Sequence, residues 1–327
     1  MNLRRRPETL LEAAEVARLA TRAAPAIASG TLQAGEQNLG NYCRAPLSEG
    51  GCAAVAEREL VTTMLALQGG MLKLAQDPAQ HKFPMVALGQ LGERGLLHRD
   101  ICSPRNEKRG PFTLLPMAGV PAYPVLWSHT AARERCLVVE PDTRGEPRPG
   151  WENEAATAWQ TATQLHFTLD FRINSQSLAA CLTPERALGG RAWPNFRLWQ
   201  TEWEKLVVLW ANSTFGLLTY WWRGTRQHQG RAVLTISELP DLLVPDPRLL
   251  PEGSAVKAEA IFRDFQAQAF LPANEAWRDR TRQALDRAVL VDLWELPEEI
   301  LDPLATLRHR WCCEPSVHGG KGTAPLA

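Results

Sequence analysis

The sequence predicts an α+β fold, in which a domain of mixed strands and helices lies between helical segments at the two ends of the chain. Three observations indicate this class: helix-forming composition near both ends, short apolar runs bounded by Pro and Gly between them, and one densely apolar stretch at residues 202–222. The 327 residues, 45% of them hydrophobic and 22% charged, suffice for two or three compact units. We therefore expect an N-terminal helical connector (residues 1–80), a mixed domain (81–251) and a C-terminal helical segment (252–327).

The N-terminal segment is expected to be helical. Residues 7–29 are rich in Ala, Leu, Glu and Arg, with Pro7 suited to the start of a helix and Gly30 to its end. Residues 31–51 are rich in Gly, Asn and Ser, which predicts a loop. A second helix, interrupted at two consecutive glycines, is expected at residues 53–75.

The central domain is expected to combine short strands with two helices. Turn residues bound each of the apolar runs that we interpret as strands, at residues 83–88, 123–128, 136–140, 169–178, 193–198 and 232–236. Dense prolines exclude long helices between residues 104 and 149. Helices are expected at residues 151–165 and 202–222, the second of them so apolar that it must be nearly buried.

Two amphipathic helices are expected near the C-terminus, at residues 255–269 and 275–294, and Pro297 opens a last helix that runs to about Trp311. Beyond Pro315 the chain contains several Gly and Pro residues, and we expect this tail to fray.

The sequence predicts neither a membrane protein nor a secreted one. No apolar run reaches the roughly 18–20 residues that a membrane helix needs, because Asn212, Ser213 and Thr214 interrupt the longest candidate. The basic cluster at the N-terminus is not followed by an apolar stretch, so it is not a secretory signal. We therefore expect a cytoplasmic protein without membrane contact.

The cysteines favour free thiols over a metal site. There are seven, an odd number, and none are spaced as a CxxC pair. Cys312, Cys313 and His318 could supply three ligands, but the sequence offers no evident fourth. A reducing compartment fits free thiols, and we assign no metal-binding residue.

The net charge of zero hides an uneven distribution. Eight Lys and Arg stand against three Glu between residues 171 and 237, whereas seven stand against fourteen Asp and Glu between 238 and 302. The first of these segments can face phosphates, while the second can face solvent or a partner protein.

Catalytic motifs are not evident. The triplet His98-Arg99-Asp100 matches part of the kinase catalytic loop, but the other kinase motifs are absent and a match of three residues is common by chance. His166 with Asp170 could form a base and the group that orients it, but a structural histidine is the favoured interpretation.

Polar side chains around residue 172 are candidates for reading DNA bases. On a strand, Arg172, Asn174 and Gln176 would lie on one face. Arg pairs with guanine, and Asn or Gln pairs with adenine. The alternative is a solvated strand face or a hydrogen-bonded turn.

A second candidate segment follows two glycines. Gly189 and Gly190 permit a tight turn with positive φ, which would present Arg191 as a charge and Trp193 as a stacking plane to a nucleic acid. The alternative is an ordinary turn beside a core tryptophan.

The third candidate segment is a cationic loop that contains no acidic residue. It lies between the apolar helix and the strand at 232–236, and its candidate contacts to phosphates or bases are Arg223, Arg226, Gln227, His228 and Arg231. The alternative is a solvated loop.

Residues 209–247 carry a further pattern. Asn212-Ser213-Thr214 lies within an apolar helix, a loop with Gly230 follows, and then come a strand, Leu239-Pro240 and Val244-Pro245. This order resembles the specificity region of bacterial N6-adenine DNA methyltransferases, in particular the large restriction-modification and phage-defence methylases. Residues 282–290 and 296–300 are similar to the closing helix of that region, so that the resemblance covers about residues 80–311. Because polar groups in a buried helix need partners, we assign the Asn-Ser-Thr motif to architecture.

The resemblance implies that residues 81–251 form a target-recognition domain with double-stranded DNA as its ligand. The family's motifs for the methyl donor and the target base are missing: Pro-Pro never occurs, and the glycines at residues 89–95 lack the flanking strand and helix. We assign no catalytic residue, and S-adenosylmethionine is expected only in a catalytic partner or a missing domain. The chain itself is then part of a split methylase or a separate specificity subunit, and whether it counts as an enzyme stays open.

Two alternatives remain. The acidic helices after residue 252 and the twelve Trp could form the surface of a protein-interaction scaffold that docks a methylase without reading DNA. The other alternative is an enzyme whose active site has no recognisable motif. Converging His and carboxylate side chains in a deep pocket would reveal such a site.

Overall fold

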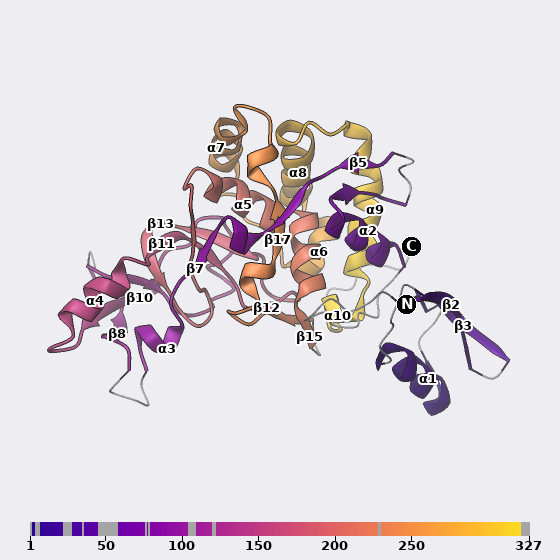
Figure 1. The fold of residues 1–327 in the computed structure, drawn as a ribbon, viewed down its shortest axis with the longest axis horizontal. Helices are drawn as coiled ribbons and strands as arrows, with labels where there is room; N and C mark the ends of the chain where they lie inside the picture. Colours follow the sequence, from indigo (N-terminus) through magenta and orange to yellow (C-terminus); the bar gives the residue numbers. More distant parts are fainter. Residues whose placement is uncertain are drawn as a thin grey trace.

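A computed structural model confirms the α+β class, with helices packed around and beside several small sheets (Figure 1). The structure describes residues 2–3, 7–21, 28–34, 36–44, 58–75, 77, 79–103, 109–119, 122–227 and 230–321. None of the helices in these ranges is both long enough and apolar enough to cross a membrane.

The largest sheet has five strands in the order β11-β13-β9-β10-β8. These strands are β8 (Phe112–Pro116), β9 (Pro124–Leu126), β10 (Thr143–Pro147), β11 (Thr163–Phe167) and β13 (Ala180–Gly189). Strand β13 pairs antiparallel with β11 and parallel with β9, and therefore joins the two halves of the sheet. Strand β13 was not predicted from the sequence, because exposed Pro184, Glu185 and Arg186 interrupt its apolar pattern.

One end of the molecule is built around this sheet. Helix α4 (Glu152–Trp159) packs against it, and α3 (His98–Ile101) lies nearby, at the left of Figure 1. A small core of its own holds this end together, made of Ile101, Phe112, Val125, Ala155, Ala158, Ala162 and Leu188. Only the first half of the helix predicted at 151–165 forms, because its last residues belong to β11 instead.

The remaining strands form small sheets. Three strands pair as β12-β16-β15, made of β12 (Asp170–Arg172), β15 (Thr225–Gln227) and β16 (Arg231–Val233). Two-stranded pairs join β4 (Met71–Leu72) to β5 (His81–Lys82), β6 (Met85–Ala87) to β17 (Leu243–Pro245), and β7 (Gly92–Arg94) to β14 (Phe196–Leu198). The predicted strand at 136–140 contributes only an isolated bridge from Val138 to Leu182.

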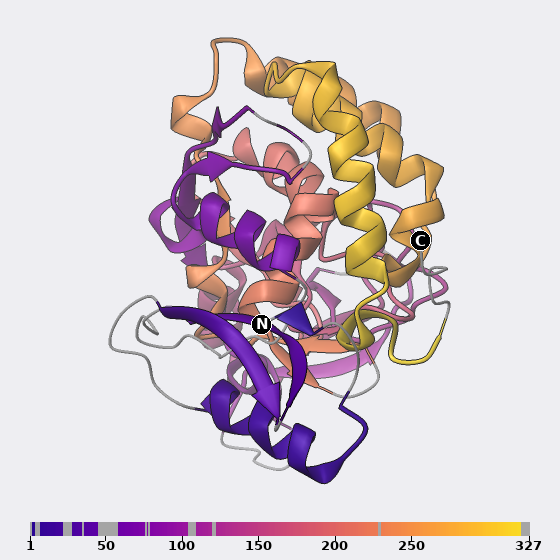
Figure 2. The ribbon, with the colours of Figure 1, turned by 90° about the vertical axis from the view of Figure 1, so that its right-hand side faces the viewer.

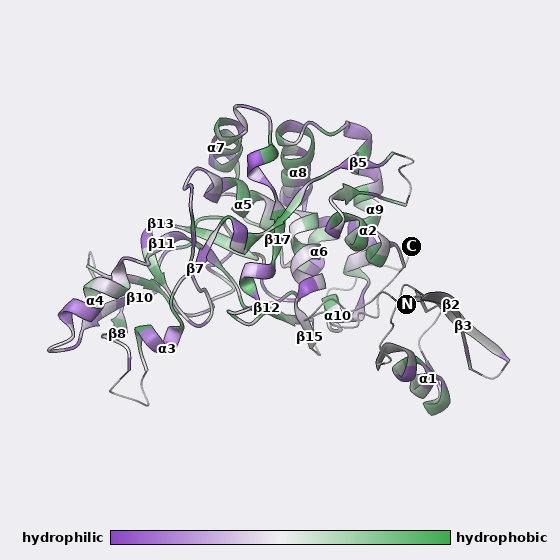
Figure 3. Cartoon of the chain, in the orientation of Figure 1, coloured by the Kyte–Doolittle hydropathy of each residue, from purple (hydrophilic) through white to green (hydrophobic). Residues whose placement is uncertain are grey.

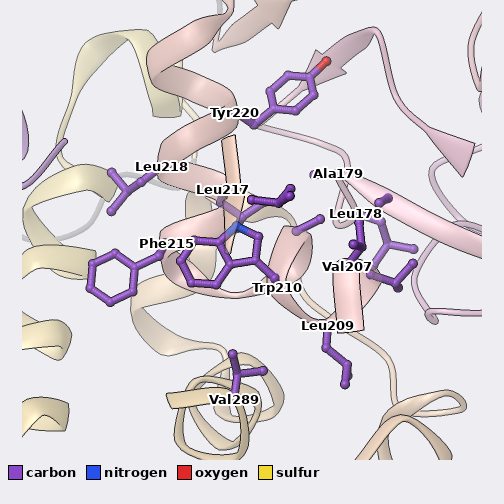
Figure 4. Close-up of a cluster of buried hydrophobic side chains, with 14 of the residues drawn as sticks. Leu178, Ala179, Val207, Leu209, Trp210, Phe215, Leu217, Leu218, Tyr220 and Val289 are labelled. Carbon is purple, nitrogen blue, oxygen red and sulfur yellow. The ribbon is translucent and has the colours of Figure 1, made fainter. Parts of the chain in front are cut away.

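The apolar stretch at 202–222 forms two helices instead of one, α5 (Trp203–Asn212) and α6 (Thr214–Arg223). Ser213 adopts an extended backbone between them, and its side chain accepts a hydrogen bond from the Gly216 amide at the start of α6. Both helices are buried as predicted. The rings of Trp210 and Phe215 stack at 6.1 Å between centroids in the middle of this core (Figure 4).

Further helices surround α5 and α6, as Figures 1 and 2 show. They are α2 (Arg58–Gln68), α7 (Ser254–Phe265), α8 (Arg280–Arg287), a π-helical turn (Ala288–Leu293) and α9 (Leu301–Cys312). Short 3-10 turns lie at Leu88–Gln90, Leu239–Asp241, Pro247–Leu249, Ala273–Arg278 and Glu298–Ile300. One apolar core runs from Leu60 to Val317 and draws side chains from all three predicted segments of the chain, whose boundaries stay a prediction.

The N-terminal prediction was partly wrong. Helix α1 (Leu10–Thr21) is shorter than expected, and strands β2 (Ala28–Ala34) and β3 (Gln37–Arg44) form a hairpin where a loop was predicted. Strand β1 (Asn2–Leu3) pairs with β3. Gly and Asn are poor strand formers in isolation, but the backbone bonds of an antiparallel ladder do not depend on side-chain type.

The C-terminal tail does not fray where the structure describes it. A short helix, α10 (Pro315–His318), packs against the core with Val317 fully buried. The indole Nε1 of Trp221 donates a hydrogen bond to Ser316 Oγ at 3.0 Å. The expected fraying is therefore wrong up to Lys321, because an apolar residue and a polar anchor hold the segment down.

Candidate nucleic-acid interface

The sheet β12-β16-β15 brings together residues that the sequence analysis had placed in two separate segments. Arg172 on β12 pairs with Arg231 on β16, and Arg231 pairs in turn with Gln227 on β15. Residues directly opposite each other on antiparallel strands share a face of the sheet. In the neighbouring row, Phe171 and Ala232 are both fully buried, so Arg172 and Arg231 lie on the outer face.

The two arginines on this face differ in whether a carboxylate pairs with their positive charge. Arg231 forms a two-pronged ion pair with Asp170, and the hydrogen bond to that carboxylate raises the pKa of the guanidinium. Arg172 is exposed, and its guanidinium forms no ion pair with a described residue. Arg172 is therefore the cation on this face that is most available to an external anion.

The prediction that three residues continue along one strand face was wrong for Asn174 and Gln176. Strand β12 ends at Arg172, and the chain turns so that the Gln176 amide donates to the Arg172 carbonyl at 2.7 Å. The Gln176 side chain folds back and accepts from the Arg172 amide at 2.6 Å, and Gln176 is only 3% exposed. Gln176 thus holds the turn in shape and cannot reach a base edge, which is the alternative that the sequence analysis left open.

Asn174 lies beside the cationic loop. A Cβ atom at Gly230 would come 3.1 Å from Cβ of Asn174 and 2.3 Å from the Val317 carbonyl oxygen. Gly230 also has φ +68, a conformation that favours glycine. Gly230 therefore lies between the turn after β12 and the C-terminal helix α10.

Arg223, the first candidate of the loop, donates to Asp241 Oδ2 at 2.7 Å. Arg226 and Gln227 lie in β15, but their side chains are outside what the structure describes. His228 lies wholly outside the described residues. Their roles in contacting DNA stay predictions.

The second predicted segment lies elsewhere, beside α3. Trp193 is fully buried and its ring meets that of His129 edge-on at 5.2 Å, so the prediction that it stacks on a base is wrong. Neither Gly189 nor Gly190 has positive φ. Their lack of a side chain is required by close approach instead, because added Cβ atoms would lie 2.1 Å from Asn195 N and 2.4 Å from Trp127 Cα.

Arg191 is exposed, and it lies beside α3, whose residues were given no functional role from the sequence. Its charge acts on His98 in α3, as do those of Arg99 and Arg109. The cluster matches no sequence motif, and only the spatial convergence of distant segments reveals it.

The Asn212-Ser213-Thr214 motif is architectural, as predicted. The Asn212 side chain accepts from the Ala179 amide at 2.9 Å and donates to the carbonyl oxygens of Ala180 and Val208 at 2.8 and 2.9 Å. Its polar groups thus satisfy strand β13 and helix α5 together, in a site with no exposure to solvent.

Buried charges extend this motif towards the C-terminal helices. Asp286 accepts from the Thr214 amide at 2.7 Å, from Thr214 Oγ1 at 2.5 Å and from Arg308 Nη1 at 2.7 Å. Arg282, with no exposed area, donates to the carbonyl oxygens of Asn212 and Ser177 and lies over the ring of Phe270. Burial raises the pKa of the Asp286 carboxyl and lowers that of the Arg282 guanidinium.

Other candidate chemistry has a structural explanation. His166 is fully buried and its Nδ1 donates to the Gln164 carbonyl oxygen at 2.9 Å, while burial lowers its pKa to about 4. Burial raises the pKa of the Cys312 thiol to about 12, so it is not a reactive thiolate at neutral pH. Within the described ranges, no three His, Cys, Asp or Glu side chains converge as metal ligands would.

No protein-family model matches this chain, and neither does any curated protein. Several solved structures are similar to it. The type IIG restriction endonuclease BpuSI matches with a TM-score of 0.43 and 12% identity, over 77% of this chain and 32% of BpuSI. The HsdS subunit from Thermoanaerobacter tengcongensis matches with a TM-score of 0.33 and 14% identity, over 79% of this chain and 50% of HsdS.

A chain from a structure of a type I R-M system matches with a TM-score of 0.32 and 14% identity, over 76% of this chain and 50% of that one. This chain therefore spans between about a third and a half of the length of the proteins it resembles.

Proposed function

We propose that this chain is the DNA target-recognition part of a restriction-modification system of the N6-adenine methyltransferase type. The observation that carries the proposal is the strand register that sets Arg172 directly opposite Arg231, because it brings two predicted DNA-contacting segments into one sheet, with the backbone of Gln227 opposite Arg231 on β15. A three-stranded face that carries an exposed arginine and a half-buried one can bind phosphates or enter a groove. The sequence resemblance supplies the class of system.

The methyl-transfer chemistry would belong to a catalytic partner, which would also bind S-adenosylmethionine. The resemblance to the specificity region supports this division, since its motifs lie within the Asn212 helix break and the loop that follows. Co-expression with a candidate methylase tests it: adenine methylation of plasmid DNA should need both chains. Methylation by the catalytic chain alone, with the same sequence preference, would contradict the proposal.

Replacing Arg172 with Ala should weaken DNA binding by about tenfold at 0.1 M salt. The loss of one phosphate contact should also lower the slope of log K against log salt by about 0.9. The measurement is fluorescence anisotropy with a labelled duplex pool, repeated from 0.05 to 0.3 M KCl. Arg278→Ala is the matched control, since Arg278 is an exposed cation already paired with Glu275.

Asp170→Asn should act in the opposite direction. Removing the carboxylate frees Arg231 and takes a negative charge off the same face, so that DNA affinity should rise and the salt slope should steepen. Equal salt slopes for the unaltered chain, Arg172→Ala and Asp170→Asn would remove this sheet from the interface. Co-purification of a methylase without any DNA retention would instead favour the scaffold.

A further inference from the structure

A second cationic surface lies at the other end of the molecule, around α3. The backbone places its parts together: Gly190 N donates to the Leu126 carbonyl at 2.8 Å, and Ala192 N donates to the Trp127 carbonyl at 3.4 Å. Arg191, between them, is thereby held beside Trp127. The ring of His98 meets the Trp127 ring edge-on at 6.3 Å, which brings α3 to the same place.

The charges here are mostly positive. Besides burial, which is the largest cause, Arg99, Arg191 and Arg109 lower the pKa of His98, whereas Asp100 raises it. The Asp100 carboxylate is already paired, since Arg109 Nε donates a hydrogen bond to its Oδ1 at 2.8 Å. Arg99 and Arg191 are both exposed, and neither forms an ion pair with a described residue.

The carboxylate that contacts the backbone of Trp127 also has hydrogen-bond partners already. The two carboxylate oxygens of Asp142 accept hydrogen bonds from the amides of Trp127 and Ser128, at 2.7 and 3.1 Å. Two exposed guanidinium groups therefore share one surface with the His98 imidazole and the half-buried Trp127 indole. An arrangement of this kind attracts an anion and offers it several donors.

The surface is rigidly built. A side chain at Gly190 would collide with Trp127, and a Cβ at Gly110 would lie 2.7 Å from the Ile101 carbonyl oxygen at the end of α3. The two segments that bring arginines to α3 are thus fixed by close backbone contact, not by flexible side chains. Donors held in place lose less entropy when a ligand binds.

We propose that His98, Arg99 and Arg191 form a second phosphate-binding patch that contacts the DNA backbone, separate from the sheet β12-β16-β15. This inference rests on the proposed function, and extends the DNA footprint to the end of the molecule that carries α3 and α4. Helix α3 and strands β12 and β15 all lie along the lower side in Figure 1, and Figure 3 shows hydrophilic residues on α3. A duplex laid along that side would meet both surfaces.

The test is DNA binding by the full chain with Arg99→Ala, Arg191→Ala and both together. Each single variant should bind a labelled duplex pool about tenfold more weakly at 0.1 M salt, and the double variant should lose about two units of salt slope. Arg278→Ala again controls for the removal of one surface charge. Because both replaced side chains are exposed, the melting temperature should stay unchanged.

Four outcomes distinguish the possibilities. Weaker binding and a lower slope for the α3 variants support the patch. Unchanged binding by the double variant, while Arg172→Ala still weakens it, overturns the patch and leaves the proposed function standing. No DNA binding by the unaltered chain overturns both. Binding of millimolar inorganic phosphate that is lost in the double variant, while DNA binding by that variant is unchanged, would assign the patch to free phosphate and overturn it as a DNA contact.

Discussion

Asp286→Ala should lower the free energy of unfolding by about 3–5 kcal/mol, because it leaves the buried Arg308 guanidinium without its counter-charge. The side chains of Asp286 and Arg308 are 1% and 6% exposed, so water cannot take the place of the lost carboxylate. The same change removes the acceptor for the Thr214 amide and hydroxyl at the start of α6. Chemical unfolding in urea at pH 7 measures the loss.

Two further variants show whether the charge or the packing is responsible. Asp286→Ala combined with Arg308→Met should cost clearly less than the sum of the two single changes, since a buried pair removed together leaves no uncompensated charge. Arg287→Ala breaks only exposed pairs, with Asp292 and Glu298, and should change stability by less than about 0.5 kcal/mol. A strictly additive double variant would contradict the assigned ion pair.

Glu204→Gln should stabilise the protein more at pH 8 than at pH 5, by a difference of about 2.5 kcal/mol. Glu204 in α5 is 7% exposed, its carboxylate accepts no hydrogen bond from a described residue, and burial raises its pKa from 4.5 to about 7. An acid with a raised pKa in the folded state binds its proton on folding. Its contribution to stability is therefore lost as the pH rises from 4.5 through 7, at about 1.36 kcal/mol per pKa unit.

In the unaltered chain this pH dependence should be masked, because the contribution of His166 to stability changes with pH in the opposite direction. Burial lowers the pKa of His166 from 6.5 to about 4, so its contribution to stability is lost as the pH falls from 6.5 towards 4. The two residues offset each other between pH 4.5 and 6.5. In Glu204→Gln the loss from His166 stands alone, and the variant should lose stability on acidification more steeply than the unaltered chain does.

Urea unfolding at pH 5 and pH 8 gives the comparison. Taking the difference between the two pH values removes any constant cost of fitting Gln into the site. Glu202→Gln, an exposed neighbour two residues earlier, should leave that difference unchanged. If Glu204→Gln changed the free energy of unfolding equally at both pH values, burial would not raise the pKa of the Glu204 carboxyl.

The candidate site could be predicted from the sequence only in part. Residue type and charge density picked out Arg172 and Arg191, which are exposed, and Arg231, which is half-buried and paired with Asp170. Burial was not predictable for Gln176 and Trp193, because a polar or aromatic side chain in a turn can point either way until its neighbours are in place. The cluster around His98 was invisible for the same reason, since Arg191 reaches it from 93 positions away in the chain.

The sequence by itself determined the α+β class, the burial of the apolar helices and the architectural role of Asn212-Ser213-Thr214. These follow from local composition and from the rule that a buried polar group must find a partner. The tertiary structure alone decided that β13 joins the main sheet, that α5 and α6 break at Ser213, and that Arg172 and Arg231 share a row. Each of these depends on pairing between distant segments, whose energy no local window of sequence contains.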